Sequence, residues 1–138
     1  MDDKCKARAL TDHLGFEHHE APVDGVHRVS LELSDIHMSS AGRVHGGVLF
    51  SLLDTAMGGA VISALPLEKG CATLEMKINY FRPVQSGKVT AVGRLINLTK
   101  NTAYAEGEVF NEEGRLLAKT SGTFFITATR KQSERERI

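Results

Sequence analysis

A long apolar segment, residues 46–67, holds a single charged side chain, that of Asp54, and constrains the fold more than any other part of the chain. The segment follows a His-Gly-Gly triplet that begins at His45. A lone carboxylate in apolar surroundings is unfavourable unless it is paired or solvated. A chain that keeps such a residue is expected to use it, so Asp54 is the first candidate functional residue.

The same segment is long enough to raise the question of a membrane span. Asp54 near its middle, the Gly58-Gly59 pair, Pro66 and the lack of basic flanking residues argue against a span. A helix covered by a sheet accounts for the same apolarity. We therefore favour a central helix that begins near Gly46 and ends before Pro66.

The composition predicts one domain and narrows the possible partners. A chain of 138 residues fits one domain with a sizeable core. Its formal charges cancel at pH 7, which gives no electrostatic case for nucleic acid or an anionic membrane as partner. The charged N-terminus lacks the apolar core of a signal peptide, and Cys5 and Cys71 show no metal or redox spacing. These features predict a cytoplasmic protein with reduced thiols.

Five segments have the character of β-strands. Residues 25–33 alternate between apolar and polar side chains, as a half-buried strand does. After the helix, turn sequences separate predicted strands at residues 73–81, 88–98, 102–110 and 116–127. In the first of these we expect one face to carry Leu74, Met76, Ile78 and Tyr80, and the other Thr73, Glu75, Lys77 and Asn79.

This element order predicts an α+β fold in which one curved antiparallel sheet wraps around a long central helix. We assign residues 21–128 to this domain, residues 1–20 to a polar segment with a short helix, and residues 129–138 to a charged tail. One sheet on one helix leaves an open sheet edge and an uncovered helix face. A second subunit would cover both.

The two glycines at the helix start are candidate anion-binding groups. Backbone N–H groups of a first helical turn have no intrahelical partner, and the helix dipole is positive there. Without side chains, Gly46 and Gly47 let a ligand carbonyl approach these N–H groups, as in an oxyanion hole. For the triplet alone, a glycine cap with nothing bound is the better interpretation.

Asp54 lies nine residues after His45, which is about 13 Å along a helix and on roughly the opposite side. It cannot reach a carbonyl held at its own helix start. It can reach one held by a neighbouring subunit if two such helices pack antiparallel about a two-fold axis. A structural cap or pair within the interface is the alternative. No Lys or Arg on the helix neutralises Asp54, which favours the catalytic interpretation.

Two stretches of the chain resemble one family. The pattern His-Gly-Gly-x-x-x-x-x-x-Asp-x-Ala at residues 45–56 and the strand sequence of residues 73–83 are similar to those of the hotdog-fold acyl-CoA thioesterases. The PaaI-like branch of the hydroxybenzoyl-CoA thioesterase superfamily is the most similar group. The resemblance runs from about Gly25 to Ile126. It implies the hotdog fold and the hydrolysis of an acyl-CoA to a free acid and CoA, with no cofactor.

The resemblance also implies a role for each matching residue. The backbone N–H of Gly46, with Gly47 beside it, would hold the thioester carbonyl. Asp54 of the partner subunit would attack the thioester carbon or activate a water. His45 would orient the thioester or its loop, and Thr73 would help to position the water or the acid.

Ser39 departs from the family pattern, which usually has Asn or Gln six residues before the histidine. Because serine is shorter, Ser40 or a water is an alternative second donor to the carbonyl. Coenzyme A carries phosphates, so basic or N–H-rich residues are expected near the site. The candidates at nearby turns are Arg82, Lys100, Asn101 and Thr102. The resemblance implies that Tyr80 and the hairpin at Lys100 line the path of the pantetheine and the nucleotide. Solvated surface charge is an equally good interpretation of each one taken singly.

We expect an enzyme that hydrolyses a small acyl-CoA, aromatic or aliphatic, as a homo-oligomer: at least a dimer, and a homotetramer if dimers pair. The rival is a non-catalytic acyl-CoA-binding hotdog domain, which would have no need of Asp54. A hotdog dehydratase or hydratase fits the spacing of His45 and Asp54 less well. The chain has no Gly-x-Ser-x-Gly elbow, and its other histidines, including His18-His19, lack metal spacing and are expected at the surface.

Overall fold

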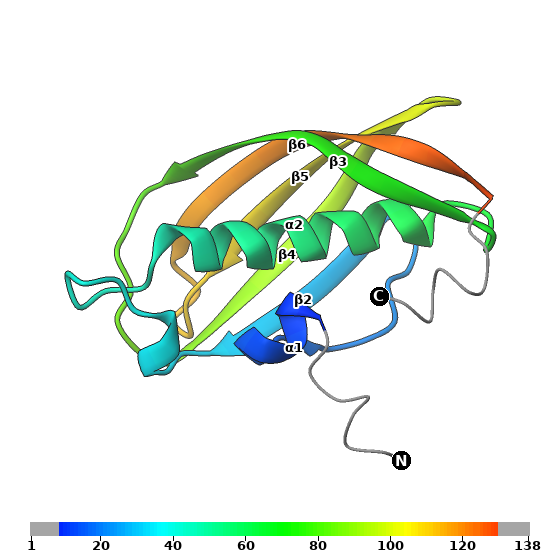
Figure 1. The fold of residues 1–138 in the computed structure, drawn as a ribbon. Helices are drawn as coiled ribbons and strands as arrows, with labels where there is room; N and C mark the ends of the chain where they lie inside the picture. Colours follow the sequence, from blue (N-terminus) through cyan, green and yellow to red (C-terminus); the bar gives the residue numbers. More distant parts are fainter. Residues whose placement is uncertain (1–8, 130–138) are drawn as a thin grey trace, which may run out of the picture.

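The computed structural model describes residues 9–129 and has a six-stranded antiparallel sheet curved around one long helix (Figure 1). The strand order across the sheet is β1-β2-β4-β5-β6-β3. The elements in chain order are α1 (Leu10–Leu14), β1 (Glu17–His18), β2 (Val26–Glu32), a 3₁₀ turn (Asp35–His37), α2 (Gly46–Ser63), β3 (Lys69–Tyr80), β4 (Lys88–Leu98), β5 (Thr102–Phe110) and β6 (Leu116–Thr129). The predicted α+β fold is confirmed. Of the predicted terminal segments, residues 1–8 and 130–138 lie outside the described residues.

The central helix α2 begins at Gly46 and ends at Ser63, three residues before Pro66, as predicted. By length and apolarity alone it would also be able to cross a membrane. In the structure one side of it packs onto the sheet, with eight buried residues: Val48, Leu49, Leu52, Leu53, Ala56, Met57, Ala60 and Val61. Asp54 lies on the part of the helix that remains accessible to solvent.

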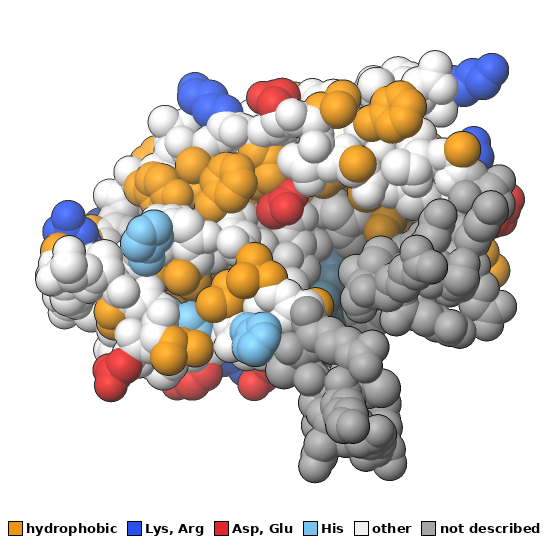
Figure 2. All heavy atoms as spheres, in the orientation of Figure 1, with side chains coloured by type: hydrophobic (Ala, Val, Ile, Leu, Met, Phe, Trp, Pro, Cys, Tyr) orange, Lys and Arg blue, Asp and Glu red, His pale blue; other side chains and the backbone are white. Residues whose placement is uncertain are grey.

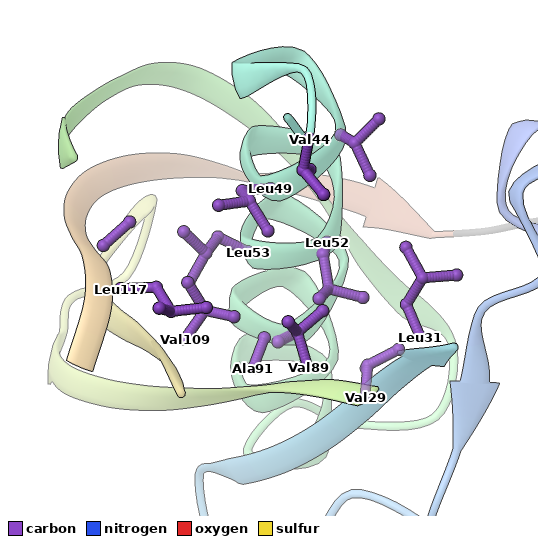
Figure 3. Packing of buried hydrophobic residues seen from close by; sticks show 13 residues of the cluster. Val29, Leu31, Val44, Leu49, Leu52, Leu53, Val89, Ala91, Val109 and Leu117 are labelled. Carbon is purple, nitrogen blue, oxygen red and sulfur yellow. The ribbon is translucent and has the colours of Figure 1, made fainter. Parts of the chain in front are cut away.

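The core forms along the contact between α2 and the strands (Figure 3). Leu52 and Leu53 of the helix and Val89 of β4 are fully buried there. Gly93 of β4 sets how closely the helix approaches, because a Cβ at this position would lie 2.3 Å from the carbonyl oxygen of Ala56. A side chain at residue 93 would therefore push α2 away from the sheet.

The strand predictions are accurate for β4 and β5, which have the expected bounds. Strand β3 begins at Lys69, four residues earlier than predicted, and β6 extends to Thr129. The two-residue strand β1 was not predicted. It is too short to show alternation and is defined by its pairing with Val29 and Ser30 of β2.

The predicted alternation along β3 is wrong at its start. The pairing with β6 shifts between Thr73 and Glu75, so Leu74 is the extra residue of a β-bulge. Leu74 is 60% exposed instead of joining Met76 and Ile78, which pack against the core. Because the bulge reverses the facing of the preceding residue, Thr73 turns toward α2, where its hydroxyl bonds to Asp54.

Two histidines contradict the expectation that the chain's histidines lie at the surface. His27 is 5% exposed and His37 is 2% exposed. His27 packs against Gly59 of α2, and the His37 ring lies between two backbone segments to which it hydrogen bonds. His18 and His19 are exposed, as predicted.

Strand β3 forms one edge of the sheet. Figure 2 shows hydrophobic side chains gathered over the face where α2 and β3 run side by side. Exposed apolar residues on these elements include Ile62 of α2 and Leu74 and Tyr80 of β3. The open edge and the uncovered helix face expected from the sequence are therefore both present in the single chain.

Candidate active site

The start of α2 presents a backbone N–H group for which the described residues provide no acceptor. His45 is the N-cap, and its Nδ1 accepts the N–H of Gly47 at 2.8 Å. The carbonyl of His45 accepts the N–H of Val48 at 2.9 Å. Within residues 9–129 no acceptor is recorded for the N–H of Gly46, which agrees with its place in the first helical turn. Of the two glycines, Gly46 is thus the one with a donor available for a ligand.

Tyr80, at the end of β3, fixes the position of this helix start. Its hydroxyl donates a 2.7 Å hydrogen bond to the carbonyl of Gly46, and partial burial raises the pKa of the phenol above its ordinary value. A Cβ at Gly46 would lie 3.0 Å from both Cζ and the hydroxyl oxygen of Tyr80. Glycine at this position therefore leaves room for the tyrosine ring.

A hollow of about 350 Å³ opens beside Gly46. Gly46 and Tyr80 line it, and two arginines, Arg43 and Arg82, lie at its border. The remaining lining residues are apolar: Val44, Leu49, Phe81, Pro83 and Val84. Neither guanidinium forms an ion pair with an acidic side chain in the part of the chain that the structure describes. Both positive charges are therefore available to a ligand.

A second, more open hollow adjoins the first, because Phe81 and Arg82 line both. Arg115 and Leu116 complete it. Arg82 was predicted from the sequence, whereas Arg43 and Arg115 were not. The position of Arg43, two residues before the N-cap His45, was a usable signal, whereas Arg115 comes to this place only through the sheet.

Asp54 and Thr73 form the second half of the candidate site. The hydroxyl of Thr73 donates to Oδ1 of Asp54 at 2.7 Å. Asp54 is partly exposed and lies eight residues beyond Gly46 on α2, which is about 12 Å along the helix. The structure thus brings Asp54 and Thr73 together and keeps both away from the Gly46 N–H of the same chain.

One other predicted group lies apart from the helix start. Lys100 and Asn101 lie in the β4–β5 turn, and Thr102 begins β5. Thr102 pairs with Phe125, which in turn pairs with Ala72 of β3. Ala72 is eight residues from Tyr80, roughly 25 Å along a strand. The turn therefore lies at the opposite end of the sheet from Tyr80 and Arg82 in one chain.

Ser39 is held within its own loop. Its N–H donates to the carbonyl of Arg43 at 2.7 Å, and its hydroxyl accepts the N–H of Ala41 at 3.3 Å. The structure therefore gives Ser39 a part in the turn before the helix. Its role as a second donor to a substrate carbonyl stays a prediction.

Comparison with known proteins gives one family match. The model of the thioesterase superfamily matches residues 41–118, which include His45, Gly46, Asp54 and Thr73. A curated relative from Haemophilus influenzae, provisionally named an esterase, is 32% identical over 128 residues, covering 91% of this chain and 90% of its own length.

Solved structures agree with this match over most of the chain. A thioesterase from Haemophilus influenzae has a TM-score of 0.84 and 28% identity, covering 91% of this chain and 87% of its own. A variant of the phenylacetic acid degradation protein PaaI from Thermus thermophilus has a TM-score of 0.74 and 34% identity, with coverage of 83% and 96%. A thioesterase-like protein from Streptococcus pneumoniae, solved with coenzyme A, has a TM-score of 0.76 and 29% identity, with coverage of 85% and 89%.

Proposed function

This chain belongs to the thioesterase superfamily and is a PaaI-like hotdog thioester hydrolase, and on that premise we propose that it hydrolyses a small acyl-CoA at sites shared between two subunits. The observation that carries the proposal is the division of the site. An unused N–H at Gly46 borders a hollow, and a carboxylate held by Thr73 lies about 12 Å away on the same helix. Neither half suffices alone.

A second copy of the chain completes the site. If the two α2 helices run antiparallel across a two-fold axis, Asp54 of each helix comes beside Gly46 of the other. The edge strand β3 and the apolar surface over α2 and β3 support this arrangement, because pairing would cover both. The same arrangement brings the Lys100 turn of one subunit toward the Arg82 end of the other.

The groups present suit thioester cleavage. The Gly46 N–H donates to the thioester carbonyl oxygen and stabilises the negative charge that develops there. Asp54 then acts by one of two routes. It attacks the carbonyl carbon, expelling CoA as a thiolate and leaving an anhydride that water hydrolyses, or it removes a proton from a water that attacks directly. In both routes the Thr73 hydroxyl occupies Oδ1, which leaves Oδ2 for the reaction.

The arginines near the helix start suit the phosphates of coenzyme A. Arg43, Arg82 and Arg115 border two adjoining hollows, and guanidinium groups bind phosphate through paired N–H donors. The coenzyme A in the Streptococcus pneumoniae structure supports this class of substrate. The likeness to PaaI supports a small acyl group, aromatic or aliphatic.

The rival function is acyl-CoA binding without turnover. The Asp54–Thr73 hydrogen bond favours the enzyme, because a binding domain has no use for a partly exposed carboxylate fixed in one rotamer on an apolar face. The test is thiol release from a panel of phenylacetyl-, short-chain and long-chain acyl-CoAs. We expect hydrolysis of the small substrates; tight binding of every member without thiol release would establish the rival.

A further inference from the structure

His37 is a buried side chain with a full set of hydrogen bonds that thioester chemistry does not require. It lies at the end of the 3₁₀ turn before α2, and only 2% of it is exposed. Its Nε2 is 2.7 Å from the carbonyl oxygen of Leu14, the last residue of α1. Its Nδ1 is 2.9 Å from the backbone nitrogen of Ser34. The ring thus connects α1 to the segment that leads into the active site.

These partners define the tautomer. The backbone N–H of Ser34 can only donate, so Nδ1 is the acceptor. The carbonyl of Leu14 can only accept, so the ring proton is on Nε2. A neutral imidazole with this one arrangement satisfies both neighbours, and no other side chain has the same shape and the same pair of donor and acceptor.

The backbone of His37 continues the connection to the helix start. Its carbonyl accepts the N–H of His45 at 2.9 Å, and the next residues, Met38 and Val44, form a bridge that closes the loop. His45 then caps α2 through the N–H of Gly47 at 2.8 Å. An unbroken series of hydrogen bonds therefore runs from α1 through His37 and His45 to the residues on either side of the Gly46 N–H.

We propose that His37 is a positioning residue that couples the docking of α1 to the orientation of the Gly46 N–H, and thereby sets the rate of thioester cleavage. The inference rests on the proposed function, since it concerns the same oxyanion donor. Neither His37 nor α1 falls within residues 41–118, which the family model matches. The coupling therefore joins a part of the chain that precedes the matched region to the helix start inside that region.

Two substitutions remove the two hydrogen bonds of the His37 ring one at a time. In His37→Asn the side-chain oxygen lies near the place of Nδ1 and keeps the bond to Ser34, but nothing reaches Leu14. In His37→Gln the terminal amide lies near the place of Nε2 and keeps the bond to Leu14, but Ser34 loses its acceptor. His37→Asn breaks the series at Leu14, whereas His37→Gln keeps it but no longer holds the side chain in place through Ser34. We therefore expect kcat to fall roughly tenfold or more in both, with KM within about twofold of wild type.

A variant of α1 tests the coupling without altering His37. Gly15 ends α1 with φ at +81°, a conformation that strains a β-branched residue, so Gly15→Val displaces the Leu14 carbonyl. We expect Gly15→Val to lower kcat in wild type and in His37→Gln. In His37→Asn, where the bond to Leu14 is already lost, it should change kcat less than twofold. Equal effects in all three backgrounds would overturn the proposal.

Thr120→Val is the matched control. It removes another buried side-chain hydrogen bond to a backbone carbonyl, that of Thr120 to Lys77 at 2.7 Å, between strands β6 and β3 of the sheet. It should lower the urea midpoint and leave kcat unchanged. If the His37 variants also lose only stability and keep kcat, His37 is structural and the proposal is wrong.

A second readout needs no substrate. Amide hydrogen exchange at His45, measured by NMR, should be faster in both His37 variants than in Thr120→Val at equal global stability, because the His45 N–H bonds to the His37 carbonyl. Unchanged exchange would overturn the coupling. If wild type hydrolyses no acyl-CoA and the exchange still responds as expected, the proposed function has failed and the coupling has not.

Discussion

The hydroxyl of Thr73 donates a 2.7 Å hydrogen bond to Oδ1 of Asp54, across the contact between strand β3 and helix α2. The β-bulge at Leu74 makes this bond possible, because regular alternation would place Thr73 and Met76 on opposite faces. The bond fixes one oxygen of the carboxylate and leaves the other free to act. Thr73 therefore controls the geometry of Asp54 without needing to touch the substrate.

Replacing Thr73 with valine should lower kcat without a matching change in KM. The substitution keeps the size and branching of the side chain but removes a hydrogen bond to a charged group, which corresponds to roughly a ten- to hundredfold loss of rate. Steady-state thiol release measures it. Thr73→Ser keeps the hydroxyl and should recover most of the rate; equal losses in the two variants would show that packing, and not the bond, matters.

Asp54→Asn should bind acyl-CoA but lose turnover. The amide has the same shape and still accepts from Thr73, but it cannot attack the thioester or remove a proton, which predicts a fall in kcat of about a hundredfold to ten-thousandfold. Isothermal titration with a non-hydrolysable acyl-CoA analogue measures the binding separately. Thiol release near the wild-type rate would refute the assignment of Asp54.

Hybrid dimers test whether the two halves of the site come from different subunits. Gly46→Pro removes the N–H donor at a position where helices tolerate proline, and Gly46→Ala is its control, because both add a Cβ against Tyr80 but only alanine keeps the N–H. Mixing Gly46→Pro subunits with Asp54→Asn subunits should restore about one active site in two per hybrid. Verified subunit exchange without any recovery would place the site within one chain.

Much of this site could be predicted from the sequence, because several local sequence patterns occur in the same segment. The apolar run, the His-Gly-Gly cap and Pro66 predict the bounds of α2, and Asp54 stands out as its single charge. The separation of Gly46 and Asp54 follows from helical geometry alone. Those predictions need no tertiary contact.

Apart from Arg43, the missed features depend on contacts between segments that are distant in sequence. The bulge at Leu74 arises from the register of β3 against β6, which no local pattern reports. Arg115 joins the hollow at Arg82 only because strand ends meet in space. His37 is buried because α1 supplies an acceptor for it, and a histidine in a polar loop gives no sign of that. Each of these three features is therefore determined by tertiary contacts.

Tyr80→Phe should slow the enzyme modestly and change its behaviour at high pH. Loss of the neutral hydrogen bond to the Gly46 carbonyl predicts a fall in kcat of roughly fivefold.

Burial raises the pKa of Tyr80, so above its ordinary pKa the unfolded chain releases this proton while the folded chain retains it. The free energy of unfolding therefore decreases as the pH rises above about 10, and this decrease is absent in Tyr80→Phe. Urea unfolding at pH 8 and pH 10.5 measures the difference.

Acid should destabilise the protein through His27. Burial and then the charge of His18 lower the pKa of His27, whose ring stacks on that of His18 at 5.1 Å between centroids. Below about pH 6.5 the unfolded chain therefore binds a proton at residue 27 that the folded chain does not bind. The free energy of unfolding thus decreases as the pH is lowered through this range. Urea unfolding at pH 8 and pH 5.5 should show a smaller acid loss in His18→Asn than in wild type. The exposed His13→Asn is the control, and an identical loss in all three proteins would contradict the assignment.

The arginines at the two hollows should act on the phosphates of the substrate and not on its thioester. Arg43→Gln, Arg82→Gln and Arg115→Gln are each expected to lower kcat/KM for an acyl-CoA by roughly three- to tenfold, and less as salt is raised. With the matching acyl-pantetheine, which lacks the nucleotide and its phosphates, the three variants should equal wild type. Arg94→Gln, which removes an exposed arginine from β4 away from the hollows, should leave both substrates unaffected. If a variant slows both substrates equally, that arginine shapes the site rather than binding phosphate, because only a phosphate contact distinguishes the two molecules.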